Sequence, residues 1–243
     1  MSKVYIKQIL EEGTLDTAVV VRGWVRTKRQ SKNVTFININ DGTTIHNIQA
    51  VVEAETISDE LLAKINTGAC LEVHGKLIAS MGNQKVEVQV EKIIILGESD
   101  AEKYPIQPKK HSFEFLREKA HLRPRTNTFG AILRIRHALA FAIHNYFNEK
   151  GFYYLHTPII TGSDAEGAGE MFRVTTLDAA NPPKTTEGKV DYSQDFFGKE
   201  TNLTVSGQLE AELAAMAFNS VYTFGPTFRA ENSNTARHLA EFW

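Results

Sequence analysis

Apolar and polar residues alternate in several short segments of the first hundred residues. Apolar residues and a glycine occupy the odd positions from 19 to 25, while a valine, a tryptophan and two arginines occupy the even positions from 20 to 26. A period of two is typical of half-buried strands. Four further segments repeat it: residues 35–40, 48–52, 71–77 and 86–90. A short helix capped by Ser58 is predicted between the third and fourth strands, which is the element order of an OB-fold β-barrel.

The second predicted strand carries an aromatic ring among amides. If Ile37 and Ile39 point inward, Phe36 shares the outer face with two asparagines, and Gln49 lies on a similar polar face of the next strand. An outward ring beside polar groups predicts a stacking platform for an unpaired base, whose edge the amide of Gln49 can contact. The alternative is a ring that another strand or domain covers.

The second half of the chain changes period. Residues 99–127 carry three prolines and weak periodicity, which predicts a linker. From Thr128 the apolar residues recur at steps of three and four, so we expect a helix with one buried face. The apolar positions are Ile132, Ile135, Leu139, Ile143 and Tyr146. After Gly151, strands are predicted over residues 152–156, 201–206 and 221–231, with a helix from Gln208 onward.

Composition and charge exclude some function classes. The 243 residues carry a formal net charge of −2, which argues against a wholly basic nucleic-acid binder. Every charged residue from 18 to 40 is nevertheless positive, which suits either a solvated strand face or a site for one phosphate-bearing partner. These residues are Arg22, Arg26, Lys28, Arg29 and Lys32. The sequence contains no membrane-length apolar run, a lone Cys70 and no cluster with zinc spacing, so we expect a cytoplasmic protein without a membrane partner.

The pattern Gly23-Trp24-Val25, Arg29, Phe36, Asp41-Gly42 and Gln49 resembles the anticodon-binding domain shared by aspartyl-, asparaginyl- and lysyl-tRNA synthetases. This resemblance implies that Phe36 stacks on the central uridine of the anticodon. It also implies that Arg29 and Gln49 contact the same base region.

The run from Phe228 to Trp243 resembles motif 2 of the class II aminoacyl-tRNA synthetases in its asparaginyl form. The resemblance implies that Arg229 is the catalytic residue, which binds the α-phosphate of ATP and the amino-acid carboxylate. It further implies that Glu231 contacts the adenine amino group, His238 the γ-phosphate, and the ring of Phe242 the adenine. From the residues alone, Arg229 and Glu231 share one strand face, which a structural ion pair would also explain.

The segment Ser206-Gly207-Gln208-Leu209-Glu210-Ala211-Glu212 is similar to the amino-acid-binding segment of aspartyl- and asparaginyl-tRNA synthetases. The similarity implies that Gln208, together with Glu166 in the loop at residues 163–172, binds the substrate's α-amino group. Aspartyl enzymes carry lysine where this chain has Ala211. A buried carboxylate without a cation is costly, so the alanine favours asparagine, and Glu210 or Glu212 can accept a hydrogen bond from its carboxamide.

Together these features predict an α+β chain. We expect an OB-fold anticodon-binding domain at residues 1–100, a hinge at 101–127 and a partial class II catalytic domain with an antiparallel sheet at 128–243. The long helix from Thr128, the glycine at 151 and the strand that reaches Pro158 resemble motif 1 of the class II synthetases, which implies a homodimer through this region. The wider stretch of residues 104–158 resembles bacterial asparaginyl-tRNA synthetases.

The implied function is ligation of asparagine to tRNA(Asn) in translation, with ATP and Mg²⁺. Asparagine first reacts to asparaginyl-adenylate, and the aminoacyl group then passes to the tRNA. Two alternatives remain: an aspartyl-tRNA synthetase of relaxed specificity, and an anticodon-binding module without catalysis.

The sequence contains nothing that resembles motif 3, the glycine-rich strand and following helix of the family. We therefore expect the magnesium ligands beyond residue 243, no metal site within the chain, and a truncated chain that is inactive alone.

Overall fold

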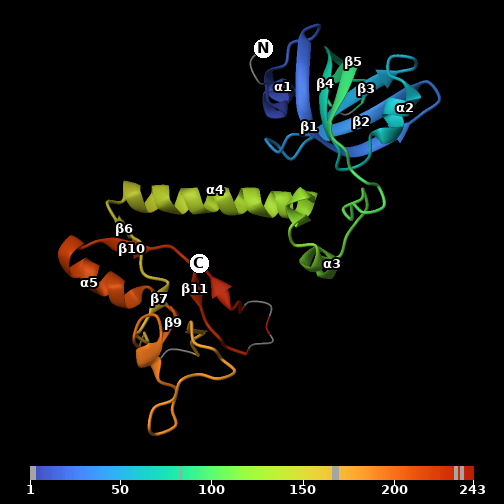
Figure 1. The fold of residues 1–243 in the computed structure, drawn as a ribbon. Coiled ribbons are helices and arrows are strands. Elements are labelled where there is room, and N and C mark those ends of the chain that lie inside the picture. The colour runs from blue at the N-terminus through green and yellow to red at the C-terminus, as the bar shows by residue number, and fades with distance from the viewer. Residues whose placement is uncertain (1–3, 83, 166–169, 233–234, 236–237) are drawn as a thin grey trace. The chain divides into compact units, whose positions relative to one another are not determined.

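The computed structural model describes residues 4–82, 84–165, 170–232, 235 and 238–243. Figure 1 gives the order of the elements along the chain. The chain divides into two compact units, Met1–His137 and Ala138–Trp243, and each is described by itself.

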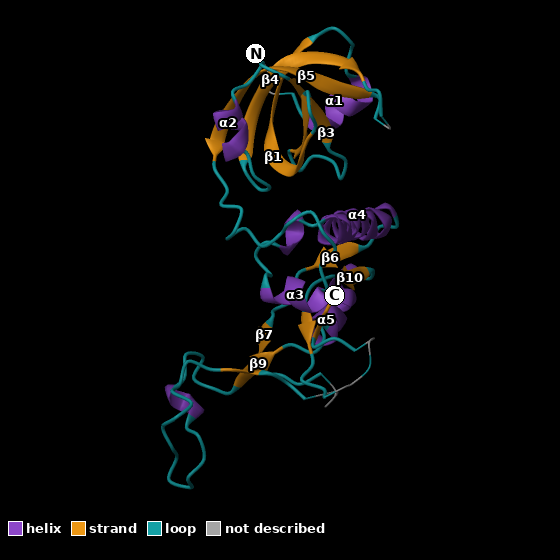
Figure 2. Cartoon of the chain, turned by 90° about the vertical axis from the view of Figure 1, so that its right-hand side faces the viewer, coloured by secondary structure: helices purple, strands orange, loops and turns teal. Residues whose placement is uncertain are grey.

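The unit Met1–His137 contains a closed five-stranded barrel, visible end-on in Figure 2. Its strands are β1 (Ala18–Gln30), β2 (Val34–Asn40), β3 (Ile48–Glu53), β4 (Cys70–Ala79) and β5 (Val86–Gly97). They pair in the order β1-β2-β3-β5-β4 and back to β1, and only β3 and β5 run parallel. This topology confirms the OB-fold predicted from the alternating segments.

The barrel core follows from the period of two. Ile37, Ile39 and Ile48 are fully buried, as are Leu71 and Val73 on β4. Burying one such side chain stabilises a fold by about 1.5–3 kcal/mol. The alternate positions lie on the outer face, as the burial of β2 shows residue by residue. The barrel is therefore stable through its own core, and its outer face is available for binding.

Gly75 marks a close approach between β4 and β5. The register shifts between His74 and Gly75, and a Cβ atom at Gly75 would lie 2.1 Å from the backbone oxygen of Gln89. Real Cβ atoms do not come this close to a backbone oxygen, so only glycine lets the two strands pair here.

Short helices complete this unit. They are α1 (Ile6–Glu12), α2 (Asp59–Lys64), α3 (Phe113–Glu118) and the 3₁₀ turn η1 (Arg123–Arg125). Ser58 caps α2 as predicted, because its side chain accepts a hydrogen bond from the backbone of Leu61. Helix α1 was not predicted, since only Ile6 and Ile9 bury a side chain and two positions give no readable period.

The unit Ala138–Trp243 contains several small sheets, the helix α5 (Gln208–Phe218) and the C-terminal part of the long helix described below. The strand β6 (Tyr153–Leu155) pairs in parallel with β10 (Val221–Thr223), and β11 (Thr227–Phe228) pairs antiparallel with β12 (Glu241–Phe242). The third sheet has the order β7-β9-β8, formed by β7 (Ile160–Thr161), β8 (Arg173–Val174) and β9 (Thr201–Leu203). A 3₁₀ turn, η2 (Tyr192–Gln194), lies between β8 and β9.

The long helix α4 (Asn127–Glu149) confirms the predicted helix but not its predicted buried face. Ile132, Ile135 and Leu139 are 45%, 59% and 58% exposed. The helix instead packs through the neighbouring stripe, where His144 and Phe147 contact the ring of Tyr222 on β10. The apolar period correctly indicated a helix. It could not show which of two adjacent helix faces packs against the rest of the chain.

Candidate functional site

The return strand of the predicted motif 2 brings Arg229 and Phe242 together. Arg229 directly follows β11, and its backbone N–H donates to the carbonyl of Ala240, 3.0 Å away, which extends the β11–β12 pairing. Phe242 lies on β12 opposite Thr227. The guanidinium carbon of Arg229 is 5.2 Å from the centroid of the Phe242 ring. Residues 13 positions apart in sequence are thus adjacent because the two strands form a ladder.

The guanidinium group of Arg229 has N–H groups without a close acceptor. Its Nη1 atom lies 3.9 Å from Oε1 of Glu231, a distance at the limit of an ion pair. Its Nε atom is buried and has no hydrogen-bond acceptor among the described residues. An unsatisfied buried donor costs about 1–3 kcal/mol, more when charged, so this position favours an anionic ligand oxygen.

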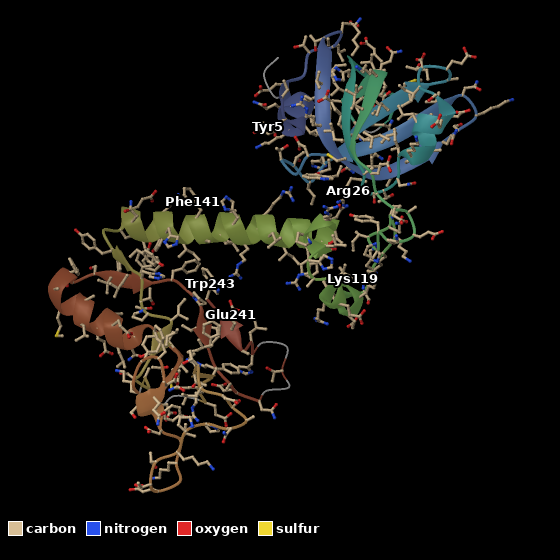
Figure 3. All side chains as sticks on the ribbon, viewed as in Figure 1. Tyr5, Arg26, Lys119, Phe141, Glu241 and Trp243 are labelled. Atoms are coloured by element: carbon tan, nitrogen blue, oxygen red, sulfur yellow. The ribbon has the colours of Figure 1, made fainter. Side chains whose placement is uncertain are left out.

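A cavity of about 210 Å³ adjoins these two side chains. Arg229, Phe242 and Trp243 line one part of it, and Thr157 and Gly207 line another. Trp243 directly follows β12, and its indole N–H donates to the Glu241 carboxylate at 3.3 Å; both side chains are labelled in Figure 3. A Cβ atom at Gly207 would lie 2.7 Å from Oγ1 of Thr157, so the glycine keeps this part of the cavity open.

Of the other predicted ligand-binding residues, the described ones do not line this cavity: Gln208, Glu210, Glu231 and His238. His238 shares a hydrogen bond of 2.6 Å with the Thr235 hydroxyl. Gln208 begins α5 and donates its amide to Oε1 of Glu212 at 2.9 Å, rather than into the cavity. Glu210 lies half-buried in the first turn of α5. Glu166 lies outside the described residues.

The sequence did not indicate the aromatic support of this region. His144 shares a hydrogen bond of 2.7 Å with the buried hydroxyl of Tyr222, and its ring packs edge-on against Tyr154 and Phe224. Phe224 in turn contacts Trp243 at 5.5 Å between ring centroids. Burial raises the pKa of Tyr222, and the nearby Tyr154 adds to the effect. These contacts join segments far apart in sequence, so no local pattern could have revealed them.

The barrel offers a second candidate surface on the outer face of β1, β2 and β3. Arg29 and Phe36 are direct cross-strand partners, and the guanidinium carbon lies 5.1 Å from the ring centroid. Asn38 lies opposite Gln49, so Gln49 is a diagonal neighbour of Phe36 on the same face. The amide of Gln49 donates to the buried carboxylate of Glu87 at 3.0 Å. The structure thus brings together the three residues predicted for this site.

Several arginines and lysines of the basic stretch have structural partners. Arg22 forms an ion pair of 2.5 Å with Glu72. Arg26 donates to the backbone carbonyl of Arg125, and Lys28 donates to that of Leu62 at 2.8 Å. Arg29, by contrast, lies over the Phe36 ring. The charge pattern of the sequence alone could not distinguish it from the other basic residues of this stretch.

The comparisons with known proteins match a family model in each half of the chain. Residues 112–243 match the family described as tRNA synthetases class II (D, K and N), and residues 19–96 match the OB-fold nucleic acid binding domain. The chain is similar to proteins named asparagine–tRNA ligase from Cytophaga hutchinsonii and Thermosynechococcus vestitus. It is 62% and 58% identical to them, with 100% and 98% of this chain and 53% and 52% of those proteins covered.

A solved structure is also similar. The crystal structure of asparaginyl-tRNA synthetase from Pyrococcus horikoshii complexed with asparaginyl-adenylate matches with a TM-score of 0.80 at 27% identity. The match covers 100% of this chain and 52% of that one.

The chain spans about half the length of the relatives it matches. Among the residues that the structure describes, none of the helices is long and apolar enough to cross a membrane. The family match covers more than half of the chain, in the same segment that carries Arg229 and Phe242. The chain therefore belongs to the class II tRNA synthetases of the D, K and N group.

Proposed function

We propose that the protein containing this chain ligates asparagine to tRNA(Asn) at the expense of ATP. The observation that carries this proposal is the 62% identity over the whole chain to a protein named asparagine–tRNA ligase. The chemistry of the site also supports it, because the buried Nε of Arg229 has no acceptor among the described residues and the guanidinium lies beside the ring of Phe242. A translation enzyme of this kind acts in the cytoplasm.

In the proposed first step, a carboxylate oxygen of asparagine attacks the α-phosphorus of ATP. The new O–P bond forms as the bond to the β-phosphate oxygen breaks, which releases pyrophosphate and leaves asparaginyl-adenylate. Arg229 donates to the α-phosphate and stabilises the charge that develops on its oxygens. Phe242 stacks on adenine, Glu231 accepts from the adenine amino group, and His238 contacts the γ-phosphate.

In the second step, a hydroxyl of the terminal ribose of the tRNA attacks the activated carbonyl carbon. The ester bond forms, AMP leaves, and the hydroxyl proton passes to the leaving phosphate. No side chain forms a covalent intermediate, so the contribution of the protein is placement and charge stabilisation.

Selection of asparagine rests on the start of α5. Ala211 carries no charge, so an aspartate side chain bound beside it would lack a cationic partner. Glu210 and Glu212 offer acceptors for a carboxamide and repel a carboxylate. We propose that Gln208 turns from Glu212 to the α-amino group of asparagine on binding, together with Glu166.

The barrel is proposed to bind the anticodon. Because the Gln49 amide N–H₂ donates to Glu87, its carbonyl oxygen is free to accept from a base N–H such as N3–H of uridine. The Phe36 ring stacks on that base, and Arg29, which lies over the ring, either moves aside or extends the stack with its guanidinium plane.

Magnesium would neutralise the phosphates of bound ATP. Among the described residues no group of three His, Cys, Asp or Glu side chains could hold a metal ion. We also propose a homodimer through α4, because Ile132, Ile135, Leu139 and Tyr146 form an exposed apolar stripe on this helix.

An ATP–pyrophosphate exchange assay on the full-length gene product that contains this sequence tests the proposal. Exchange should depend on asparagine and should fall by at least about a hundredfold in Arg229→Ala, because one preorganised charge-stabilising donor is lost. Arg173→Ala is the matched control, since Arg173 is exposed and pairs only with Glu200 among the described carboxylates. Exchange that is equal or faster with aspartate would contradict the asparagine assignment.

A further inference from the structure

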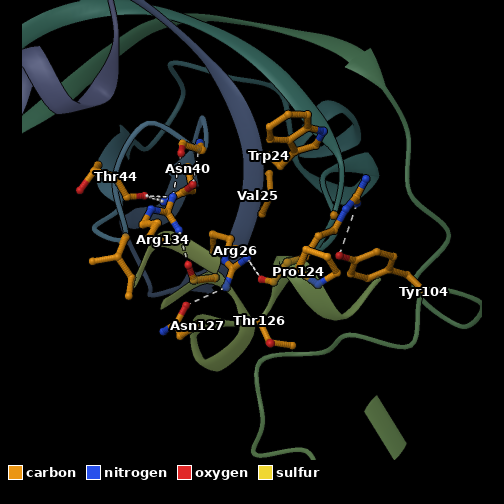
Figure 4. A pocket seen from close by; sticks show the side chains of 15 residues that line it. Trp24, Val25, Arg26, Asn40, Thr44, Tyr104, Pro124, Thr126, Asn127 and Arg134 are labelled. Carbon is orange, nitrogen blue, oxygen red and sulfur yellow. Dashed lines mark hydrogen bonds between the residues drawn. The ribbon is translucent and has the colours of Figure 1, made fainter. Parts of the chain in front are cut away.

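The unit Met1–His137 holds a cavity of about 270 Å³ that neither the anticodon face nor the Arg229 site uses. Figure 4 shows it beside β1, with Trp24 and Tyr104 as its aromatic walls and with Arg26 and Arg134 directed into it. The remaining wall comes from the segment around Asn127, where α4 begins.

Three arginines line this cavity, and no aspartate or glutamate of the described part of the chain does: Arg26, Arg125 and Arg134. None of the three forms an ion pair with a described carboxylate. Burial lowers the pKa of Arg26, as does the charge of Arg125, while Tyr104 opposes the shift. Arginine nevertheless stays charged in proteins, so the cavity holds three uncompensated positive charges.

Neutral acceptors fix the arginines in place. Arg26 donates to the carbonyl of Arg125 and to Oδ1 of Asn127 at 2.9 Å. Arg134 donates to the backbone carbonyls of Gly42 at 2.7 Å, Gly130 at 3.0 Å and Thr44 at 3.2 Å. Such bonds orient the guanidinium groups without cancelling their charge. Each group has five N–H donors, so three of Arg26 and two of Arg134 remain for a ligand.

Arg125 is held more loosely. Its closest polar contact is with the Tyr104 hydroxyl at 3.5 Å, and its guanidinium carbon lies 5.8 Å from the Tyr104 ring centroid and 5.9 Å from that of Trp24. This side chain can therefore turn toward a ligand without breaking a strong bond.

A second cavity, of about 560 Å³, adjoins the first and shares Arg26 and Tyr104 with it. It adds Lys109, Lys110 and His111, and again no described carboxylate lines it. The positive charge thus continues on both sides of Arg26.

We propose that the cavity between Trp24 and Tyr104 is a phosphate-binding site, in which Arg26, Arg125 and Arg134 bind a phosphate group. Bidentate guanidinium–phosphate hydrogen bonds would satisfy free N–H groups and offset part of the positive charge of the three arginines. The phosphate belongs either to a free phosphorylated small molecule or to a polynucleotide backbone.

The two tryptophans of the chain make a site-specific readout possible. Trp24 lines this cavity and Trp243 lines the Arg229 cavity. Indole N–H signals of the ¹⁵N-labelled 243-residue chain, assigned with Trp24→Phe, separate the two sites in one NMR titration. Inorganic pyrophosphate at low ionic strength should shift the Trp24 signal saturably. If the proposed ATP site at Arg229 does not bind pyrophosphate, only the Trp243 signal will fail to shift, so the two proposals are tested separately.

Arg125→Gln tests the residues with the least risk to the fold. We expect it to weaken binding by on the order of tenfold, because one charge-assisted hydrogen bond is lost. Arg117→Gln is the matched control, since it removes the same charge from α3, where Arg117 faces Glu114 at 3.8 Å and does not line the cavity. Arg26→Gln should weaken binding at least as much as Arg125→Gln.

A short abasic DNA oligomer distinguishes the two sources of phosphate, because it has phosphates but no base to stack on Phe36. Binding of pyrophosphate would support a free phosphorylated ligand, and a Trp24 response to the oligomer alone would support a polynucleotide backbone. The proposal is wrong if neither probe shifts the Trp24 signal, or if Arg117→Gln weakens binding as much as Arg125→Gln. The arginines would then have only a structural role, in packing the start of α4 against the barrel.

Discussion

Replacing Phe36 by alanine removes the ring that we expect to stack on an anticodon base. Stacking of a base on an aromatic side chain contributes about 1–3 kcal/mol. In the free protein, however, Arg29 already lies over the ring at 5.1 Å. An exposed cation–π contact of this kind contributes about 0.5–1 kcal/mol. If the base displaces Arg29, the net cost of Phe36→Ala is smaller, about 0.5–2 kcal/mol, or roughly 2- to 30-fold in affinity.

A double-mutant cycle distinguishes displacement of Arg29 by the base from a stack in which Arg29 stays on the ring. In an Arg29→Ala background the ring is uncovered, so Phe36→Ala should cost the full stacking energy of about 1–3 kcal/mol, at least about fivefold in affinity. If Arg29 stays in place and extends the stack, the two substitutions should instead weaken binding cooperatively.

Fluorescence anisotropy with an anticodon stem-loop RNA measures these affinities. Leu96→Ala is the matched control, because Leu96 is 54% exposed on β5 and is not paired with Arg29, Phe36 or Gln49. Phe36 lies on the outer face of β2, so the barrel should remain folded, which circular dichroism checks. Equal affinities for the Arg29→Ala protein with and without Phe36→Ala would refute the stacking role.

Three further predictions concern stability. Gly75→Ala should destabilise the barrel by at least about 1–3 kcal/mol in urea unfolding, because its Cβ would press on the Gln89 backbone oxygen at 2.1 Å. Asp195 accepts hydrogen bonds from two threonine hydroxyls and two backbone N–H groups, which hold its pKa well below the usual range. Its stabilising effect should therefore be complete above about pH 4 and be lost as pH falls below it, seen as a falling Tm. Because the pKa of Tyr222 is raised, the folded state keeps that proton longer, and stability should fall as pH rises above about 10, an effect that Tyr222→Phe removes.

Each of these has its own control. Gly82→Ala should leave urea unfolding unchanged, since the nearest atom to its Cβ would be 3.6 Å away. Asp178→Asn should lower Tm much less than Asp195→Asn, because Asp178 is exposed and accepts one backbone hydrogen bond. An Asp195→Asn protein with unchanged Tm at pH 7, or alkaline stability that Tyr222→Phe does not alter, would contradict the corresponding argument.

The barrel was predictable because its information is local. A period of two, a capped helix and a turn are each readable within ten residues, and β2 places Ile37 inward and Phe36 outward as the period requires. The covered face of α4 was not predictable, because it depends on Tyr222, which is 75 or more residues away from the helical residues that it contacts.

The sites show the same division between local and distant information. Arg229 and Phe242 were named from a motif, and the ladder between their strands explains their contact. Arg26 donates to the backbone carbonyl of Arg125 and to the distant Asn127, and the Nε of Arg229 is buried without an acceptor among the described residues. Local side-chain patterns report neither fact. The charge pattern of the sequence could therefore locate a basic region, but it could not distinguish arginines with a structural role from arginines that bind a ligand.

The strand order of the barrel also matters while the chain is being synthesised. The last strand to emerge, β5, lies between β3 and β4, and the pairing of β4 with β1 joins residues 46 or more positions apart. Until residue 97 has left the ribosome, β3 and β4 each expose an unpaired edge, which can pair with other nascent chains. Closure of the barrel is thus a single late event, and a ribosome that pauses before residue 86 would hold an open and aggregation-prone sheet.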